Sequence, residues 1–240
     1  MSRLVILFLL FSPLCLADTL RIGLPDSDYP PYHFMAGKEE GIVSDLLNRF
    51  AKQYGVSIDY FYVPEKRSQK MLDEGLLDGR IESVEWYVGQ NQYYWSDALA
   101  VVEDVLVMPS GCHIPMIEQL AGYVLMARYG YTYPQFEHLF QSGDMHRENF
   151  YSEFEMLLAL MDWEHNQRVA VISRDALTWY VARNNDFKKF TVSDYSVGKA
   201  PLQLQFAFDE RGKETSKQFN DFLKNLKSSG EFAKIMNNYQ

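Results

Sequence analysis

Two carboxylates, Glu82 and Glu85, fall at the end of a short predicted strand near residues 80–84. Carboxylates at such a place can attract a cationic ligand, or act as a general acid or base where burial raises their pKa. Ser83 adds a hydroxyl, and Trp86 with the tyrosine that follows it would form an aromatic wall. The alternative interpretation is a solvated loop whose two rings pack in a core or at a hinge.

A second polar segment begins at Gly130, which heads a turn containing Tyr131 and Thr132. A glycine-headed loop that enters a helix suits an anion, because its N–H groups and the helix dipole point at the ligand. The five histidines show no metal-ligand spacing, and the common hydrolase and phosphate-loop motifs are absent from the sequence. We therefore expect no metal, no cofactor and no catalysis.

The first 17 residues have the pattern of a secretory signal peptide. Arg3 precedes an apolar run at residues 4–11, and Cys15-Leu16-Ala17 offers small residues two apart. We expect cleavage after Ala17 and a mature protein in the periplasm, without lipid on Cys15 and with Cys112 as its single cysteine. The apolar run is too short for a permanent membrane helix.

Composition narrows the partners. The formal net charge is -9, with 23 Lys and Arg against 32 Asp and Glu, and no basic cluster offsets it. This excess of acid argues against nucleic acid as a partner. The 16 Tyr and 16 Phe could line a small-ligand cleft or simply fill cores.

Helices and strands alternate along the chain, which indicates a parallel sheet with helices on its faces. We predict strands near residues 19–24, 56–62, 80–84, 123–127, 169–172 and 202–208. We predict helices near residues 43–54, 65–74, 150–163, 175–184, 219–229 and 231–239, with Gly55 and Gly230 as two of the helix stops. The length fits one body of two α/β lobes.

Several short motifs, in this order and spacing, resemble the family 3 extracellular solute-binding proteins, the polar amino-acid receptors of ABC importers. They are Leu20-Arg21-Ile22-Gly23, residues 29–34, Gly41 with 45–47, residues 75–79, Trp95-Ser96-Asp97, residues 120–122 with Gly130, and pieces of residues 219–239. The resemblance implies a two-lobed type II periplasmic-binding-protein fold, α/β, with mixed sheets flanked by helices and two hinge crossings. Lobe 1 would comprise residues 18–108 with 203–240, and lobe 2 residues 109–202. A monomer that closes on a small-molecule ligand and docks on an inner-membrane ABC permease is the implied function.

The resemblance also assigns site residues. Tyr29 would cover the ligand, although its ring could instead pack on the prolines beside it. The segment Glu82, Ser83, Glu85 and Trp86 falls where the family places polar ligand contacts. Tyr131 and Thr132 would hold the ligand from lobe 2. Asp175 matches the aspartate that pairs with a ligand ammonium, or it is the N-cap of the next helix.

One departure concerns specificity. Gly89 occupies the place of the arginine that grips a ligand α-carboxylate in the family, and Arg80 or Arg128 would replace it only if the fold brings one into the cleft. Without that arginine a buried carboxylate lacks a partner. We therefore expect an amine-bearing ligand without a free carboxylate. Two alternatives stay open: a secreted dehydratase-like enzyme on the same scaffold, and a ligand-sensing subunit for a membrane receptor.

Overall fold

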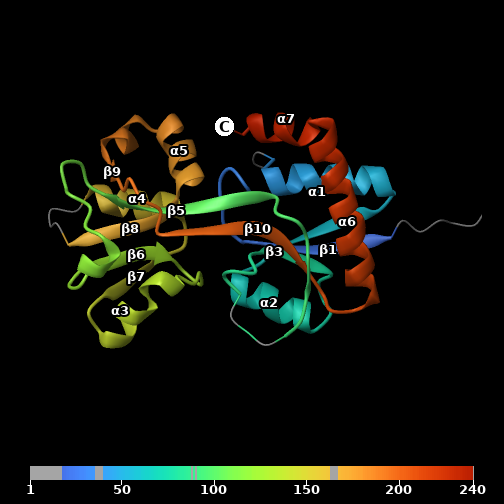
Figure 1. The fold of residues 1–240 in the computed structure, drawn as a ribbon, viewed down its shortest axis with the longest axis horizontal. Helices are drawn as coiled ribbons and strands as arrows, with labels where there is room; N and C mark the ends of the chain where they lie inside the picture. Colours follow the sequence, from blue (N-terminus) through green and yellow to red (C-terminus); the bar gives the residue numbers. More distant parts are fainter. Residues whose placement is uncertain (1–17, 36–39, 88, 90, 163–166, 240) are drawn as a thin grey trace, which may run out of the picture.

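Two α/β lobes lie side by side in the computed structural model, and two long strands run from one lobe into the other (Figure 1). The structure describes residues 18–35, 40–87, 89, 91–162 and 167–239, so the expected signal peptide lies outside the described residues. The strands are β1 (Thr19–Leu24), β2 (Ser57–Tyr62), β3 (Gly79–Glu82), β4 (Tyr94–Trp95), β5 (Ala100–Met108), β6 (Val124–Arg128), β7 (His146–Phe150), β8 (Arg168–Ser173), β9 (Thr191–Val192) and β10 (Gly198–Phe206). The α-helices are α1 (Ile42–Tyr54), α2 (Glu65–Asp73), α3 (Glu137–Ser142), α4 (Glu153–Met161), α5 (Arg174–Arg183), α6 (Glu210–Ser229) and α7 (Glu231–Asn237).

The sheet has the order β2-β1-β3-β10-β5-β8-β6-β7, and it is mixed. β1 is parallel to β2 and β3, and β6 is parallel to β7 and β8. β10 and β5 are antiparallel to their neighbours. The α/β class and the two hinge crossings predicted from the sequence are confirmed.

The crossing strands β5 and β10 each divide their length between the lobes. Residues 198–202 of β10 pair with β5, and residues 203–206 pair with β3 of the first lobe. The second half of β5 pairs with β8 of the second lobe. The apolar run at 202–208 predicted the last strand there; the strand begins instead at Gly198, because its first half is the hinge partner of β5.

The first lobe is held by one core between its sheet and the helices α1, α6 and α7. The largest rings in it are Phe50 of α1 and Phe219 and Phe222 of α6, with ring centroids 5.2 Å apart for Phe50 and Phe219. Helix α2 covers the opposite side of this sheet (Figure 1). Such packing leaves the carboxyl ends of β1 and β3 at the edge that faces the second lobe.

The second lobe buries both faces of its sheet, which explains its continuous apolar strands. Along β5, Val105 and Val107 pack in the cluster under α4 and α5, while Leu106 and Met108 pack in the cluster on the α3 side. This alternation is the period-two pattern of a strand. Of the buried side chains of β5, Val102 packs in the core of the first lobe, and those from Val105 onward pack in the second lobe. The lobe boundaries at 108/109 and 202/203 stay a prediction.

Helix ends follow local chemistry. Gly55 (φ 68°) and Gly230 (φ 76°) end α1 and α6 in the left-handed region, as predicted from glycine at those positions. The helix predicted from residue 150 begins at Glu153, because the Ser152 side chain accepts a hydrogen bond from the Glu155 N–H and caps it. Phe150 therefore belongs to β7.

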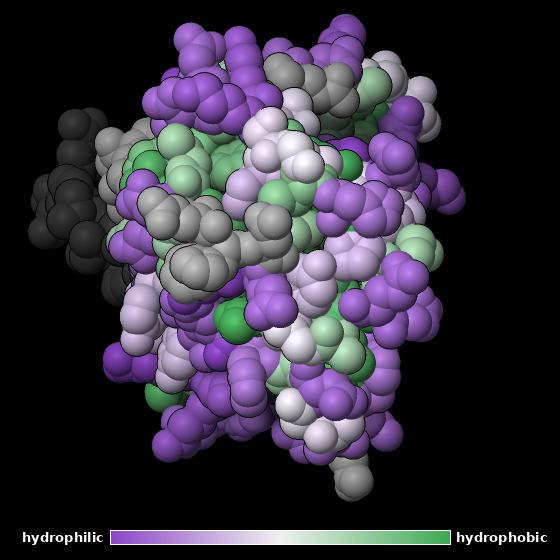
Figure 2. All heavy atoms as spheres, turned by 90° about the vertical axis from the view of Figure 1, so that its left-hand side faces the viewer, coloured by the Kyte–Doolittle hydropathy of each residue, from purple (hydrophilic) through white to green (hydrophobic). Residues whose placement is uncertain are grey.

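The surface at the far end of the second lobe mixes polar and apolar residues, with hydrophilic side chains around most of its margin (Figure 2). Within the described ranges, no helix combines the length and the apolar character that a membrane span needs.

Candidate functional site

A cavity of about 90 Å³ lies between the lobes, at the carboxyl ends of the parallel strands. Ligands in α/β proteins bind at such ends. The first lobe lines it with Tyr29, Glu65, Ile81, Glu82 and Trp86, the crossing strands with Asp104 and Leu202, and the second lobe with Arg128, Gly130, Tyr131, Thr132, Tyr133, Glu153, Val171, Ile172 and Ser173.

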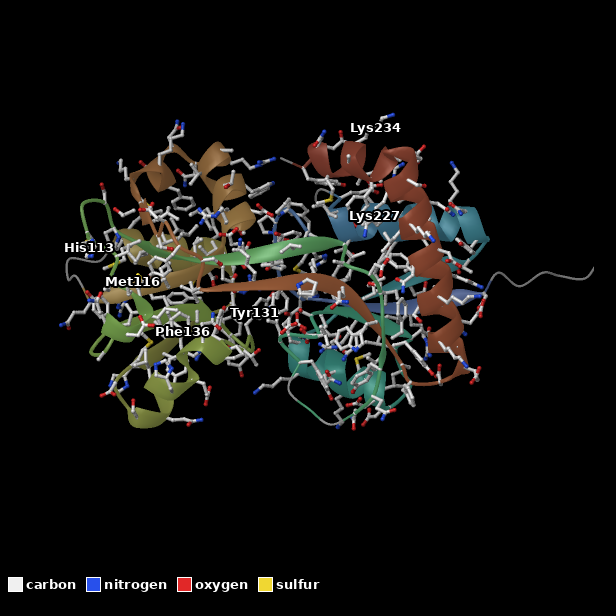
Figure 3. All side chains as sticks on the ribbon, in the orientation of Figure 1. His113, Met116, Tyr131, Phe136, Lys227 and Lys234 are labelled. Carbon is white, nitrogen blue, oxygen red and sulfur yellow. The ribbon has the colours of Figure 1, made fainter. Side chains whose placement is uncertain are left out.

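Aromatic rings form much of the cavity wall. Tyr29, which is 4% exposed, meets Tyr131 of the other lobe edge to face, with ring centroids 6.1 Å apart. Tyr131 lies on the side of the second lobe that faces the first (Figure 3). Burial raises the pKa of both phenols well above the usual value, so their hydroxyls stay protonated and can donate hydrogen bonds.

Arg80 lies outside the cavity wall and contacts two of the cavity carboxylates. It is buried in β3, and its Nη1 lies 3.1 Å from Glu65 Oε2 while its Nη2 bonds Glu82 Oε2. Its Nε donates to Gln205 Oε1 at 2.7 Å. Burial raises the pKa of Glu65 to about 7, against the lowering effect of Arg80. Arg80 is therefore engaged in lobe 1 and does not line the cavity.

Arg128 is the one arginine on the cavity wall among the described residues. Its Nη1 lies 2.7 Å from Glu153 Oε2, and both side chains are at most 4% exposed. The guanidinium also lies over the Tyr131 ring at 5.1 Å and donates to the Asp28 carbonyl of the first lobe at 3.2 Å. Its buried Nε has no hydrogen-bond partner.

The lobes are in direct contact around the cavity. Tyr32 Oη donates to Asp175 Oδ2 at 2.7 Å, and Thr132 Oγ1 donates to the Trp86 carbonyl at 3.1 Å. The Phe34 ring of the first lobe meets the Trp179 ring of the second at 5.4 Å. The structure therefore shows the closed arrangement of the two lobes.

Comparison with known proteins shows to which family the chain belongs. The sequence matches the bacterial extracellular solute-binding proteins, family 3, over residues 20–240. The chain belongs to this family. The resemblance in the short motifs is thereby confirmed, and the cavity between the lobes of this solute-binding protein is its candidate ligand site. No curated protein matches the sequence.

Solved structures share the fold at low sequence identity. The substrate-binding protein of an amino acid ABC transporter is 18% identical, with a TM-score of 0.74 over 92% of this chain and 98% of that chain. The GluR0 ligand-binding core in complex with L-glutamate is 16% identical, with a TM-score of 0.77 over 93% and 99%. A histidine kinase sensor domain similar to periplasmic binding proteins is 19% identical, with a TM-score of 0.74 over 93% and 96%.

The structure brings five of the eight predicted site residues of this solute-binding protein to the cavity wall: Tyr29, Glu82, Trp86, Tyr131 and Thr132. Three others do not line the cavity. Ser83 is buried and its Oγ accepts from the Glu85 N–H, while Glu85 is exposed. Asp175 is exposed on α5 and bonds Tyr32. The helix cap considered for Asp175 belongs instead to Ser173, whose Oγ accepts from the Ala176 N–H. The ligand contacts themselves stay a prediction.

Four charged or phenolic residues of the cavity wall were not predicted from the sequence: Glu65, Asp104, Tyr133 and Glu153. For Asp104 the sequence contains one signal, which is its charge within the apolar stretch 98–108.

Gly89 takes the place of the family's arginine, and the structure describes it but not the residues on either side. A Cβ on Gly89 would lie 2.1 Å from the Tyr87 hydroxyl. An arginine at this position would therefore have to displace the Tyr87 ring.

The hydrogen bond between Tyr32 and Asp175 is expected to favour the closed state. Tyr32→Phe removes only the hydroxyl, and because Asp175 is exposed no buried charge is left without a partner. A net loss of about 1 kcal/mol should weaken ligand binding about fivefold in calorimetry. Tyr60→Phe is the matched control, because that hydroxyl bonds Asn48 within the first lobe. Equal changes in the two variants would argue against a role of the Tyr32 bond in closure.

Proposed function

We propose that this protein captures a small amine-bearing solute by closing its two lobes and delivers it to an ABC-type importer. The observation that carries the proposal is the charge of the cavity. Four carboxylates line it, from Glu65, Glu82, Asp104 and Glu153, against the single wall arginine Arg128 and the buried Arg80 behind two of them. The four carboxylates thus outnumber the two arginines by two, although Arg80 contacts both Glu65 and Glu82.

A cationic solute would supply the missing charge. At an effective dielectric near 20, unit charges about 4 Å apart interact by roughly 4 kcal/mol before desolvation, which is enough to reverse a preference between anion and cation. The tyrosine and tryptophan rings add to this, because the faces of such rings attract cations. A free carboxylate on the ligand would meet repulsion from the same wall.

A second candidate ligand is an α-amino acid held by Arg128. The orphan Nε of Arg128 favours it, since an unmade buried hydrogen bond is costly. Against it, Glu153 already neutralises the guanidinium at 2.7 Å. The family match and the transporter protein among the similar structures support uptake, and the sensor domain among them makes a membrane receptor the alternative partner.

The dehydratase-like alternative is less well supported by the cavity. An acid with a pKa raised to about 7, such as Glu65, has the properties of a general acid or base. An anionic substrate, however, needs cationic partners, and both arginines are already paired with carboxylates. We therefore propose a binding protein and no catalytic residues.

We also propose that the protein is secreted. The mature protein should begin at Asp18 in the periplasm, and N-terminal sequencing of periplasmic material tests this.

Ligand binding is tested by a thermal-shift screen of small amines, amino acids and organic acids, followed by small-angle scattering. A ligand at a hundredfold excess over Kd should add about 2.7 kcal/mol to the free energy of unfolding. The scattering profile should become more compact. A screen without any shift, with scattering that never changes, would refute a binding role.

A further inference from the structure

Asp104 lies where the hinge strand β5 passes from one lobe to the other. Its partners in the sheet are Gly198 on β10 and Ser173 on β8. Residues directly opposite in a sheet project to the same face. Gly198 has no side chain, and the Ser173 hydroxyl is turned to the start of α5, where it accepts from the Ala176 N–H at 3.1 Å. Neither neighbour covers the Asp104 carboxylate, which lines the cavity.

The Asp104 carboxylate has no hydrogen bond and no ion pair within the part of the chain that the structure describes. The other three cavity carboxylates are all paired: Glu65 and Glu82 with Arg80, and Glu153 with Arg128. The groups that act on Asp104 are the negative Glu153 and the uncharged phenols of Tyr29, Tyr32 and Tyr133. Burial and the charge of Glu153 raise the pKa of Asp104 to about 7.

The next residue on the same strand behaves differently. Glu103 projects to the opposite face of β5, where Arg174 and Lys199 contact its carboxylate at 3.3 and 3.4 Å. A carboxylate that is paired this way needs no ligand. Asp104 therefore stands out as an acceptor that the fold places at the cavity and leaves unsatisfied.

We propose that Asp104 binds the cationic group of the solute, as the carboxylate partner of an ammonium or guanidinium held among the tyrosine rings. This inference rests on the proposed function and deepens it. Asp104 follows Val102 of the first-lobe core and precedes Val105 of the second-lobe core. Neutralising a charge at this point of the crossing strand would couple recognition of the cation to the hinge.

The test is calorimetry with 1,4-diaminobutane on the wild type, Asp104→Asn and the matched control Glu103→Gln. Each variant removes one negative charge from the same strand, on opposite faces. Loss of one partner of a buried, hydrogen-bonded charge pair should weaken diamine binding by Asp104→Asn at least about thirtyfold. Glu103→Gln should change it by less than about threefold, because the Glu103 carboxylate lies on the opposite face of the strand and is paired with Arg174 and Lys199.

A second readout does not depend on any ligand. Because the Asp104 carboxylate has no partner among the described residues and its pKa is raised, Asp104→Asn should raise the Tm of the ligand-free protein more at about pH 8 than at about pH 4, where the carboxyl is protonated in the folded state and partly so in the unfolded state. This gain also shows that the variant folds.

The outcomes separate the two proposals. Wild-type diamine binding that Asp104→Asn retains would overturn the role of Asp104 and leave the proposed function standing. Tight binding of an α-amino acid that is abolished in Asp104→Asn would support the role of Asp104 in binding the cationic group. It would overturn the proposal that the ligand is an amine without a free carboxylate. A wild type that binds no tested solute, with no rise in Tm for Asp104→Asn at about pH 8, would overturn both.

Discussion

Arg128→Met should lower the free energy of unfolding by about 3 to 5 kcal/mol. The substitution leaves Glu153, which is 2% exposed, as a charge without its partner. It also removes the bond from Arg128 to the Asp28 carbonyl of the other lobe. Urea denaturation followed by circular dichroism measures the loss.

The double variant Arg128→Met/Glu153→Leu is the informative control. Replacing a whole buried ion pair by apolar side chains is often close to neutral, so the double variant should recover most of the lost stability. Lys189→Met, which breaks an exposed pair with Asp186, should cost less than about 1 kcal/mol. A double variant as unstable as Arg128→Met would show that the guanidinium stabilises the lobe through contacts other than Glu153.

Diamine affinity should fall as the pH drops below about 7. Asp104, with its pKa raised to about 7, attracts a cation only when it is ionised, whereas alkyl amines stay protonated throughout this range. Between about pH 8 and pH 5.5 a single such carboxylate should weaken binding roughly thirtyfold. Glu65, with a pKa also raised to about 7, can steepen the profile. Calorimetry with 1,4-diaminobutane across this range measures the effect.

The stability of the ligand-free protein should depend on pH in the opposite direction to the diamine affinity, and fall as the pH rises. A carboxyl whose pKa is raised from 3.8 to about 7 binds more protons in the folded than in the unfolded state between these values. Its contribution to stability is therefore present at low pH and is lost as the pH rises through about 7. Asp104→Asn should flatten both the affinity and the stability profiles. Unchanged slopes in that variant would assign the titration to another group.

Much of the fold could be predicted because it is set by local patterns. Alternating apolar residues predicted the strand at 19–24, which is found as β1. Helical spacing of apolar residues, followed by Gly55, predicted a helix that ends just before this glycine, and it is found as α1. The short motifs then gave the family and the two-lobed architecture, because their order follows the order of these elements. The strand start at Gly198 was missed because a hinge strand is defined by pairing with β5, almost 100 residues earlier.

The site was predicted less completely, and for the same reason. Tyr29, Tyr131 and Thr132 reach the cavity because they follow strands whose ends meet there. Whether a carboxylate is paired depends on residues far away in the chain: Glu153 meets Arg128 across 25 positions. Asp104 could not be singled out, because its lack of a partner depends on Gly198 and Ser173, which only the assembled sheet places beside it.

The most direct measurement is titration calorimetry of the ligand-free wild type with 1,4-diaminobutane and with L-glutamate, both at about pH 8, which is above the pKa of about 7 of Asp104 and Glu65. The account predicts tight binding of the diamine with a Kd in the micromolar range or below, and no measurable binding of glutamate. Submicromolar binding of glutamate, with none of the diamine, would contradict it, because the cavity would then select the charge that its excess of carboxylates should repel.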